Sequence, residues 1–173
     1  MIVTSAIIDD LSREPPLSAI GTSWHLYTDR VMGGVSQGRM LREVVAARPA
    51  IRMDGDVSLE NNGGFIQICL DLAPDGEVAD ACNWAGVELD VYGKKEEYSL
   101  RLRTIDLTAP WQSYRQGFVV EPKWQTIQLF FNRFERHRTE TPLNLRHLRR
   151  LGIVAIGRVF SADLALGGIR FFV

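Results

Sequence analysis

The sequence has few of the residues from which metal, redox and disulfide sites are built. It contains two cysteines, three histidines and three lysines among 173 residues. Cys69 and Cys82 are too few for a disulfide framework, and neither a C-x-x-C pair nor a histidine cluster with ligand spacing occurs. We therefore predict reduced thiols, no metal and no cofactor. Apolar runs stay short of the ~20 residues that span a bilayer, and the first residues lack a signal-peptide pattern, which together predict a cytoplasmic protein without a transmembrane segment.

Charge is balanced along the whole chain but unevenly placed within it. The formal net charge is −1, so the composition gives no reason to expect a nucleic-acid partner. Between Asp54 and Glu97 there are eleven acidic residues and two lysines, whereas the stretch Arg133–Arg150 holds six arginines. We expect the arginine-rich stretch to contact an acidic protein partner.

Short runs rich in β-branched and aromatic residues recur along the chain, and long helical patterns do not. Tyr98, Leu100 and Leu102 alternate with polar residues, as in a strand with one buried face. This spacing predicts an all-β, antiparallel sandwich or barrel in a single domain, residues 1–173. The predicted helix is short, at 142–150, with Asn144 as a possible N-cap. The predicted strands are 23–28, 38–45, 50–59, 65–72, 84–92, 97–105, 111–120, 124–131, 151–157 and 165–173.

Two glycine-rich segments, "DRVMGG" from Asp29 and "ENNGG" from Glu60, are predicted to meet at one end of the fold. The strands 38–45 and 50–59 lie between them and are nearly equal in length at ~3.3 Å per residue. A chain reversal at 46–49 would bring the second segment back beside the first. On this argument Met32 and Asn62 become near neighbours.

Known catalytic loops explain the first glycine segment poorly. Gly34–Gly38 matches the loose pattern G-x-S-x-G, in which Ser36 would be an exposed nucleophile, but that elbow leads from a strand into a helix and here a strand follows. A phosphate-binding loop would end in Gly-Lys-Ser/Thr, which is absent. Turn chemistry explains more, because Asp29 can accept hydrogen bonds from nearby amides and the glycines adopt backbone angles closed to other residues.

The segments "DRVMGGVSQGRM" and "GDVSLENNGGFIQI" together closely resemble the complex I intermediate-associated protein family. The resemblance continues through "YSLRLRT", "WQSYRQGF", "WQTIQLFF" and "LRRLGIVAIG", and it covers most of the chain. It implies an antiparallel jelly-roll β-sandwich of the galactose-binding-like type, with no established enzyme activity. Mitochondrial members are assembly factors of NADH:ubiquinone oxidoreductase, and this chain resembles a single-domain member of the bacterial type.

The family motifs imply a candidate surface for a ligand or partner. Its residues are Asp29, Met32, Gly33, Gly34, Ser36, Asn61, Asn62, Gly63, Gly64, Phe65, Arg101, Arg103, Tyr114, Phe118 and Trp124. Several have a structural alternative. Arg101 and Arg103 either contact a ligand or pair with the acids of 54–97, Met32 is expected to tuck inward and secure its loop, and Trp124 is expected to pack rather than stack on a ligand.

Three functions follow from these patterns. The leading hypothesis is a non-catalytic module that binds a protein or small ligand and assists the assembly of a respiratory or other membrane-associated complex. The second is a carbohydrate-binding module, suggested by the sandwich and its aromatics. The third is an unrecognised hydrolase that uses Ser36 or Asp29.

Overall fold

The computed structural model describes residues 1–173 and is built almost wholly from β-strands, with no α-helix. The strands are β1 Ile7–Asp9, β2 His25–Thr28, β3 Gln37–Val45, β4 Arg48–Val57, β5 Phe65–Asp71, β6 Gly86–Gly93, β7 Glu96–Thr104, β8 Ser113–Val120, β9 Gln125–Phe130, β10 Glu135–His137, β11 Leu148–Ile156 and β12 Phe160–Phe172. Single 3-10 turns lie between them: η1 Asp29–Met32, η2 Glu60–Asn62, η3 Pro74–Gly76, η4 Phe131–Arg133 and η5 Leu145–His147.

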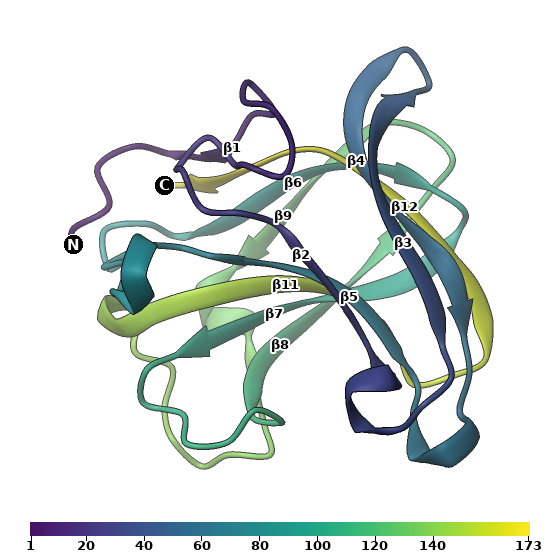
Figure 1. Ribbon diagram of the computed structural model, residues 1–173. Coiled ribbons are helices and arrows are strands. Elements are labelled where there is room, and N and C mark those ends of the chain that lie inside the picture. The colour runs from purple at the N-terminus through teal and green to yellow at the C-terminus, as the bar shows by residue number, and fades with distance from the viewer.

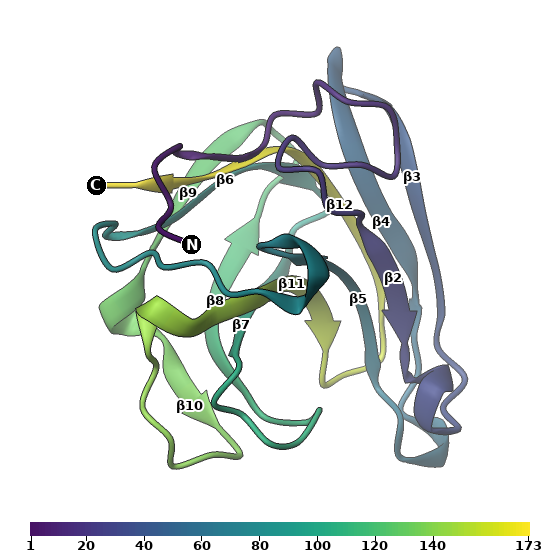
Figure 2. The same ribbon diagram turned by 60° about the vertical axis from the view of Figure 1, so that its left-hand side comes forward.

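The strands form two antiparallel sheets that pack face to face (Figures 1 and 2). The first sheet has the order β3-β4-β12-β6-β9, and β1 pairs with β12 beside this path. The second sheet has the order β10-β8-β7-β11-β5-β2. The last two strands of the chain, β11 and β12, thus lie inside the two sheets, each between strands from much earlier in the sequence.

Alternation along each strand places one set of side chains in the common core. In β7, Tyr98, Leu100 and Leu102 are buried, while Arg101 and Arg103 lie on the opposite face of the second sheet. Thirty-two buried residues drawn from both sheets form the core cluster. Burial of apolar surface at ~25 cal/mol per Å² is the main force that holds the sheets together.

The ten predicted strands are all present, and two further strands appear. β1 and β10 have three residues each, too short for a periodic pattern to indicate them. The predicted helix at 142–150 is wrong: only η5 is helical, and β11 begins at Leu148. Asn144 does cap this turn, because its side chain accepts a hydrogen bond from the amide of Arg146 at 3.0 Å.

The chain reverses where the sequence predicts it. β3 and β4 pair as a hairpin with Val45 opposite Arg48, and the two turn residues Ala46 and Ala47 both have positive φ. The hairpin therefore returns the chain to the end from which β3 started. No helix in the structure has the length and apolar character that crossing a membrane requires.

Candidate functional site

The two glycine-rich segments are joined by the buried carboxylate of Asp29. Its Oδ1 atom accepts a hydrogen bond from the amide of Ser36 at 2.9 Å. Its Oδ2 atom accepts from the Ser36 hydroxyl at 2.5 Å and from the amide of Gly64 at 2.6 Å. Asn61 adds a bond across the same gap, from its side-chain amide to the carbonyl of Gly33 at 3.2 Å. The predicted meeting of the two segments is confirmed, and we call this set of contacts the Asp29 clamp.

Glycine is needed in the clamp because backbone lies directly against the carboxylate. A Cβ atom on Gly34 would stand 2.4 Å from Asp29 Cγ, and one on Gly63 would stand 2.4 Å from Asp29 Oδ2. Burial by itself would raise the pKa of Asp29. The hydrogen bonds from Ser36 and from the amides of Gly64 and Phe65 outweigh that effect and hold the pKa below its usual value. The carboxylate therefore stays ionised inside the protein.

Asp29 and Ser36 are fully buried, so the expectation that they face a ligand or act as catalysts is wrong for both side chains. The partners of the Ser36 hydroxyl are Asp29 and the backbone of Ser58, and no histidine is among them. A buried hydroxyl with this partner set is not an accessible nucleophile. The hydrolase hypothesis thus loses the residues on which it depended.

A third connection lies beside the clamp. β11 ends opposite the start of β5, with Ile156 facing Phe65, and β12 begins opposite the end of β4, with Phe160 facing Val57. The β11–β12 turn therefore runs next to the β4–β5 connection, and the amide of Gly157 donates to the carbonyl of Gly64 at 3.0 Å. Figures 1 and 2 show η1, η2 and this turn at the same end of the sandwich.

These three loops expose aliphatic side chains to solvent. The exposed fractions are 71% for Val31, 58% for Met32, 46% for Leu59 and 71% for Val159. The expectation that Met32 tucks inward is wrong, because Asp29 already secures the loop and leaves Met32 outside. We call Val31, Met32, Leu59, Val159 and the exposed amides Asn61 and Asn62 the loop surface. Large exposed apolar side chains that cluster on fixed loops are typical of interaction sites.

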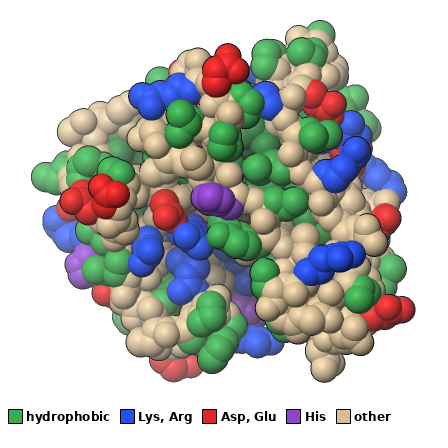
Figure 3. Space-filling view, viewed as in Figure 1, with side chains coloured by type: hydrophobic (Ala, Val, Ile, Leu, Met, Phe, Trp, Pro, Cys, Tyr) green, Lys and Arg blue, Asp and Glu red, His purple; other side chains and the backbone are tan.

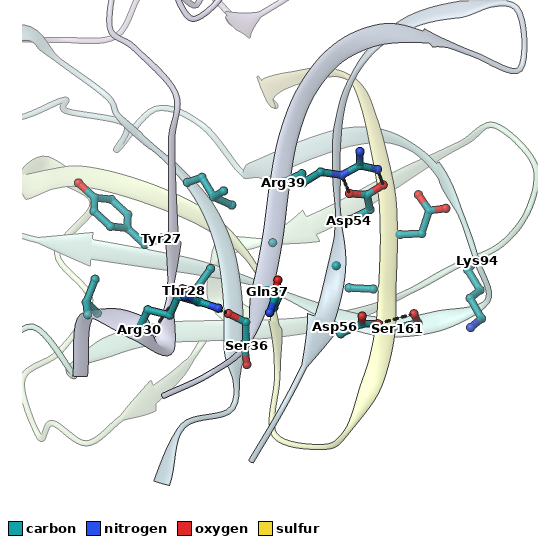
Figure 4. A pocket seen from close by; sticks show the side chains of 16 residues that line it. Tyr27, Thr28, Arg30, Ser36, Gln37, Arg39, Asp54, Asp56, Lys94 and Ser161 are labelled. Atoms are coloured by element: carbon teal, nitrogen blue, oxygen red, sulfur yellow. Dashed lines mark hydrogen bonds and ion pairs between the residues drawn. The ribbon is translucent and has the colours of Figure 1, made fainter. Parts of the chain in front are cut away.

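A shallow polar hollow borders the loop surface and is drawn in Figure 4. It has a volume of about 860 Å³ and lies between β2 with η1 on one side and β3, β4 and β12 on the other. Some of its charged groups are satisfied within the protein. Arg39 donates to both oxygens of Asp54 at 2.9 and 2.8 Å, and Ser161 donates to Asp56 at 2.9 Å. Arg30, Asp56 and Lys94, which also line the hollow, form no ion pair and are the charged groups that it leaves free for a ligand.

Arg101 and Arg103 share the outer face of the second sheet as predicted, but neither pairs with an acidic residue. The alternative in which they pair with the acids of 54–97 is therefore wrong, since the ion pairs of the protein include neither side chain. Arg103 has a structural task, because its Nη1 atom donates to the carbonyls of Ala109, Pro110 and Gln112. Arg101 donates only to the hydroxyls of two serines.

The two sheets differ in how their arginines are neutralised. In the first sheet Arg39, Arg48, Arg52 and Arg170 pair with carboxylates, and only Arg42 does not. In the second sheet only Arg150 is paired, with Asp71. Its unpaired arginines are Arg101, Arg103, Arg115, Arg136 and Arg149, with Arg133 and Arg138 beside β10. Figure 3 shows blue side chains gathered over β11 and β7.

Three aromatic residues of the candidate surface, Tyr114, Phe118 and Trp124, lie away from the loop surface. Tyr114 and Phe118 belong to the core, and the Tyr114 hydroxyl donates to the carbonyls of Thr141 and Pro142. The expectation that these two contact a ligand is wrong, because Arg115 between them takes the outer face. Trp124 packs as expected. Its indole N–H donates to the carbonyls of Val45 and Ala46, at the far end of β3 from the loop surface.

The remaining members of the candidate surface sit at the clamp. Gly33 ends η1 with a φ of 90°, and Phe65 begins β5 half-buried. Sequence reasoning overlooked Val31, Leu59 and Val159, although Val31 is an apolar residue inside a glycine loop and could have drawn attention. Arg115, Arg133 and Arg158 were overlooked as neighbours of Arg101. No group of three or more histidine, cysteine, aspartate or glutamate side chains is arranged to hold a metal ion.

Comparison with known families gives one match that covers most of the chain. The family model described as Complex I intermediate-associated protein 30 (CIA30) matches residues 18–166. No curated protein matches the sequence.

Solved structures give the fold. A family 11 carbohydrate-binding module from Clostridium thermocellum, solved in complex with a β-1,3-1,4-mixed-linked tetrasaccharide, superposes with a TM-score of 0.75 at 13% identity, covering 97% of this chain and 95% of that one. A family 30 carbohydrate-binding module gives a TM-score of 0.64 at 12% identity, covering 97% and 86%. An exo-β-agarase gives 0.60 at 9% identity, covering 96% of this chain and 24% of the enzyme. The predicted galactose-binding-like jelly roll is confirmed.

Proposed function

The chain belongs to the complex I intermediate-associated protein 30 family, and from this premise we propose that it is a non-catalytic module that binds a partner protein while a larger complex is assembled. The contact is made by the loop surface. The complex is a respiratory or other membrane-associated assembly, as the family's description suggests. The compartment is the cytoplasm, in keeping with the sequence pattern.

The observation that carries the proposal is the exposure of Val31, Met32, Leu59 and Val159 on loops that are held in place. Asp29 ties the first two loops, and the Gly157–Gly64 hydrogen bond ties the third. A surface that is ordered before binding loses little conformational entropy when a partner docks. Aliphatic side chains at the centre of such a surface can supply most of the binding energy, and polar groups at its rim supply orientation. Asn61 and Asn62 are suited to the second task.

The arginines of the second sheet favour an acidic partner. Arg115, Arg133, Arg136, Arg138 and Arg149 are exposed and lack ion pairs. Unneutralised positive charge on one face of a protein speeds association with acidic proteins and disfavours basic ones. The prediction that the stretch Arg133–Arg150 contacts an acidic partner rests on these charges.

The experiment compares aspartate variants at two ends of the same sandwich. The double variant Val31→Asp/Val159→Asp places charge on the loop surface. The control Val44→Asp alters a residue that is 69% exposed at the far end of β3. Each chain is expressed in cells that lack the native protein, and membrane complexes are resolved on native gels alongside cross-linked partners identified by mass spectrometry.

We expect wild type and Val44→Asp to capture the same partner and restore the full complex. The double variant should weaken capture by ~30-fold, the effect of losing about 2 kcal/mol at a binding hot spot. Equal capture by all three chains, or normal complexes in cells without the protein, would overturn the proposal.

The likeness to carbohydrate-binding modules supports a second candidate, a sugar ligand on the outer face of the second sheet. Tyr27 and His25 lie next to each other there on edge strand β2, with ring centroids 6.2 Å apart. Aromatic faces beside polar side chains suit sugar rings. Binding of a mixed-linked β-glucan tetrasaccharide at millimolar concentration, lost in Tyr27→Ala, would support this candidate, and no binding would exclude that sugar.

A further inference from the structure

A cavity on the outer face of the second sheet gathers four arginines from separate parts of the chain. Arg101 comes from β7, Arg115 from β8, Arg133 from η4, and Arg158 from the β11–β12 turn. The cavity has a volume of about 490 Å³, and we call it the arginine cavity. We propose that it binds the carboxylate or phosphate group of a small anionic molecule. The proposal does not depend on the loop surface, although Arg115 and Arg133 are also among the arginines that favour an acidic partner.

Arg101 is the half-buried member and has donors to spare. Its Nε atom donates to Ser99 Oγ at 3.4 Å and its Nη1 atom to Ser113 Oγ at 3.1 Å. Its Nη2 atom has no acceptor in the protein, and it is not sealed from solvent. A guanidinium presents five N–H groups in a planar fork that matches the oxygens of a carboxylate or phosphate. Because Arg101 lines the cavity, its unused donors are available to an anion bound there.

The charge around Arg101 is not compensated from within the protein. Burial, together with the charges of Arg115 and Arg138, lowers the pKa of Arg101 to about 10, so the side chain is still protonated at neutral pH. A cation that is partly removed from water and lies beside other cations is stabilised when an anion binds. Oriented arginines without counter-ions are a recurrent basis of carboxylate and phosphate recognition.

The acids that line the cavity do not neutralise it. Glu97 and Glu135 form no ion pair with any arginine, and Arg158 pairs with Glu96 while it lies over the ring of Phe160. Glu97 lies over Gly117, since a Cβ atom there would stand 2.8 Å from Glu97 Oε1. An exposed carboxylate at this place competes with an incoming anion. Removal of its charge by Glu97→Gln should therefore strengthen binding.

The size of the cavity indicates a ligand larger than an inorganic ion. Pockets for small molecules have volumes of ~300–1,000 Å³, and this cavity falls within that range. Ser99 and Gln116 on its wall can contact neutral polar parts of the molecule. Glucose, glucuronate and glucose 6-phosphate form a matched set of probes, because they share one body and differ in the anionic group.

The test is a titration of the full chain with each probe, followed by heteronuclear NMR and calorimetry. Glucuronate or glucose 6-phosphate should bind at least tenfold more tightly than glucose. Arg101→Gln, which keeps a hydrogen-bonding side chain but removes the charge, should weaken the anion about tenfold or more. The matched control Arg39→Gln removes one positive charge from the first sheet and should change affinity less than twofold.

The pKa of His137 provides a second measurement, and a change in packing alone would not produce the expected shift. Burial and the charges of Arg101, Arg115 and Arg138 lower the pKa of His137. Arg101→Gln should raise this pKa in the free protein, and a bound anion should raise it in wild type. Arg115→Gln, at an exposed position, serves if Arg101→Gln does not fold.

Three results would overturn the proposal. The first is that glucuronate and glucose 6-phosphate bind no more tightly than glucose, or that none of the three binds. The second is that the control Arg39→Gln weakens anion binding as much as Arg101→Gln does, or as much as Arg115→Gln if that variant is used instead. Such a result would indicate nonspecific attraction. The third is an anion that binds without moving the pKa of His137.

Discussion

Replacement of Asp29 by asparagine should destabilise the protein by about 3 kcal/mol. Asparagine has nearly the same shape, but one of its two terminal atoms is an NH₂ donor. On either side of the carboxylate it would face donors, the Ser36 amide on one side or the Gly64 amide and Ser36 hydroxyl on the other. At least one buried N–H then lacks an acceptor, at ~1–3 kcal/mol, and the other bonds lose their charge assistance.

Urea unfolding followed by tryptophan fluorescence measures this change. A loss of about 3 kcal/mol corresponds to a fall in Tm of ~6–12 °C for a chain of this length. Asp75→Asn is the control, because Asp75 is exposed on η3 and forms no hydrogen bond through its side chain. It should change the free energy of unfolding by less than ~0.5 kcal/mol.

The effect of Asp29→Asn should also depend on pH in a defined direction. The pKa of Asp29 is lowered in the folded protein, so the folded state favours the carboxylate. The contribution of Asp29 to stability is complete above its pKa in the unfolded chain, about 3.9. It declines as the pH falls from there through its pKa in the folded protein. The difference in free energy of unfolding between wild type and Asp29→Asn should therefore become smaller below about pH 4. A difference under ~0.5 kcal/mol at pH 7, or one that is constant down to pH 2, would refute the role of the clamp.

Two other predictions concern the hairpin and the thiols. Ala46→Asn/Ala47→Gly should stabilise the protein by ~1 kcal/mol in the same urea assay, because both positions have positive φ and Asn-Gly favours such a turn; unchanged or lower stability would contradict the turn geometry. Cys69 is buried and its pKa is raised to about 11, so a thiol reagent at pH 8 should modify only half-exposed Cys82 in the folded protein. Rapid modification of two thiols, or of one thiol in Cys82→Ser, would contradict this reading.

Much of the fold could be predicted because alternation and turn residues act locally. The hairpin β3–β4 and the alternation of Tyr98 and Leu100 needed no distant information. The segment 142–150 misled because leucine and arginine favour helices. Its last three residues instead begin β11, which pairs with β5 on one side and β7 on the other, and this tertiary pairing overrides local propensity.

The candidate site could be predicted only in part, because residue types do not reveal which side of a sheet they occupy. Tyr114 and Phe118 each stand two places from Gln116 on β8, and their face depends on the register with β7, in which Arg115 pairs with Arg101. A shift of one residue would exchange the two faces. The prediction that Met32 tucks inward is wrong for another reason. Gly34 and Gly63 pack against Asp29, so the methionine has no space within the clamp.

The inner positions of β11 and β12 have a consequence for biosynthesis. Until residues 148–172 have left the ribosome, β5 and β7 lack the strand that joins them, and so do β4 and β6. Both halves of the nascent chain then carry open edges of the kind that pair with other polypeptides. Neither sheet can therefore close before these residues emerge, and a stop codon that removes only β12 would separate β3 and β4 from β6 and β9 and leave β1 without a partner.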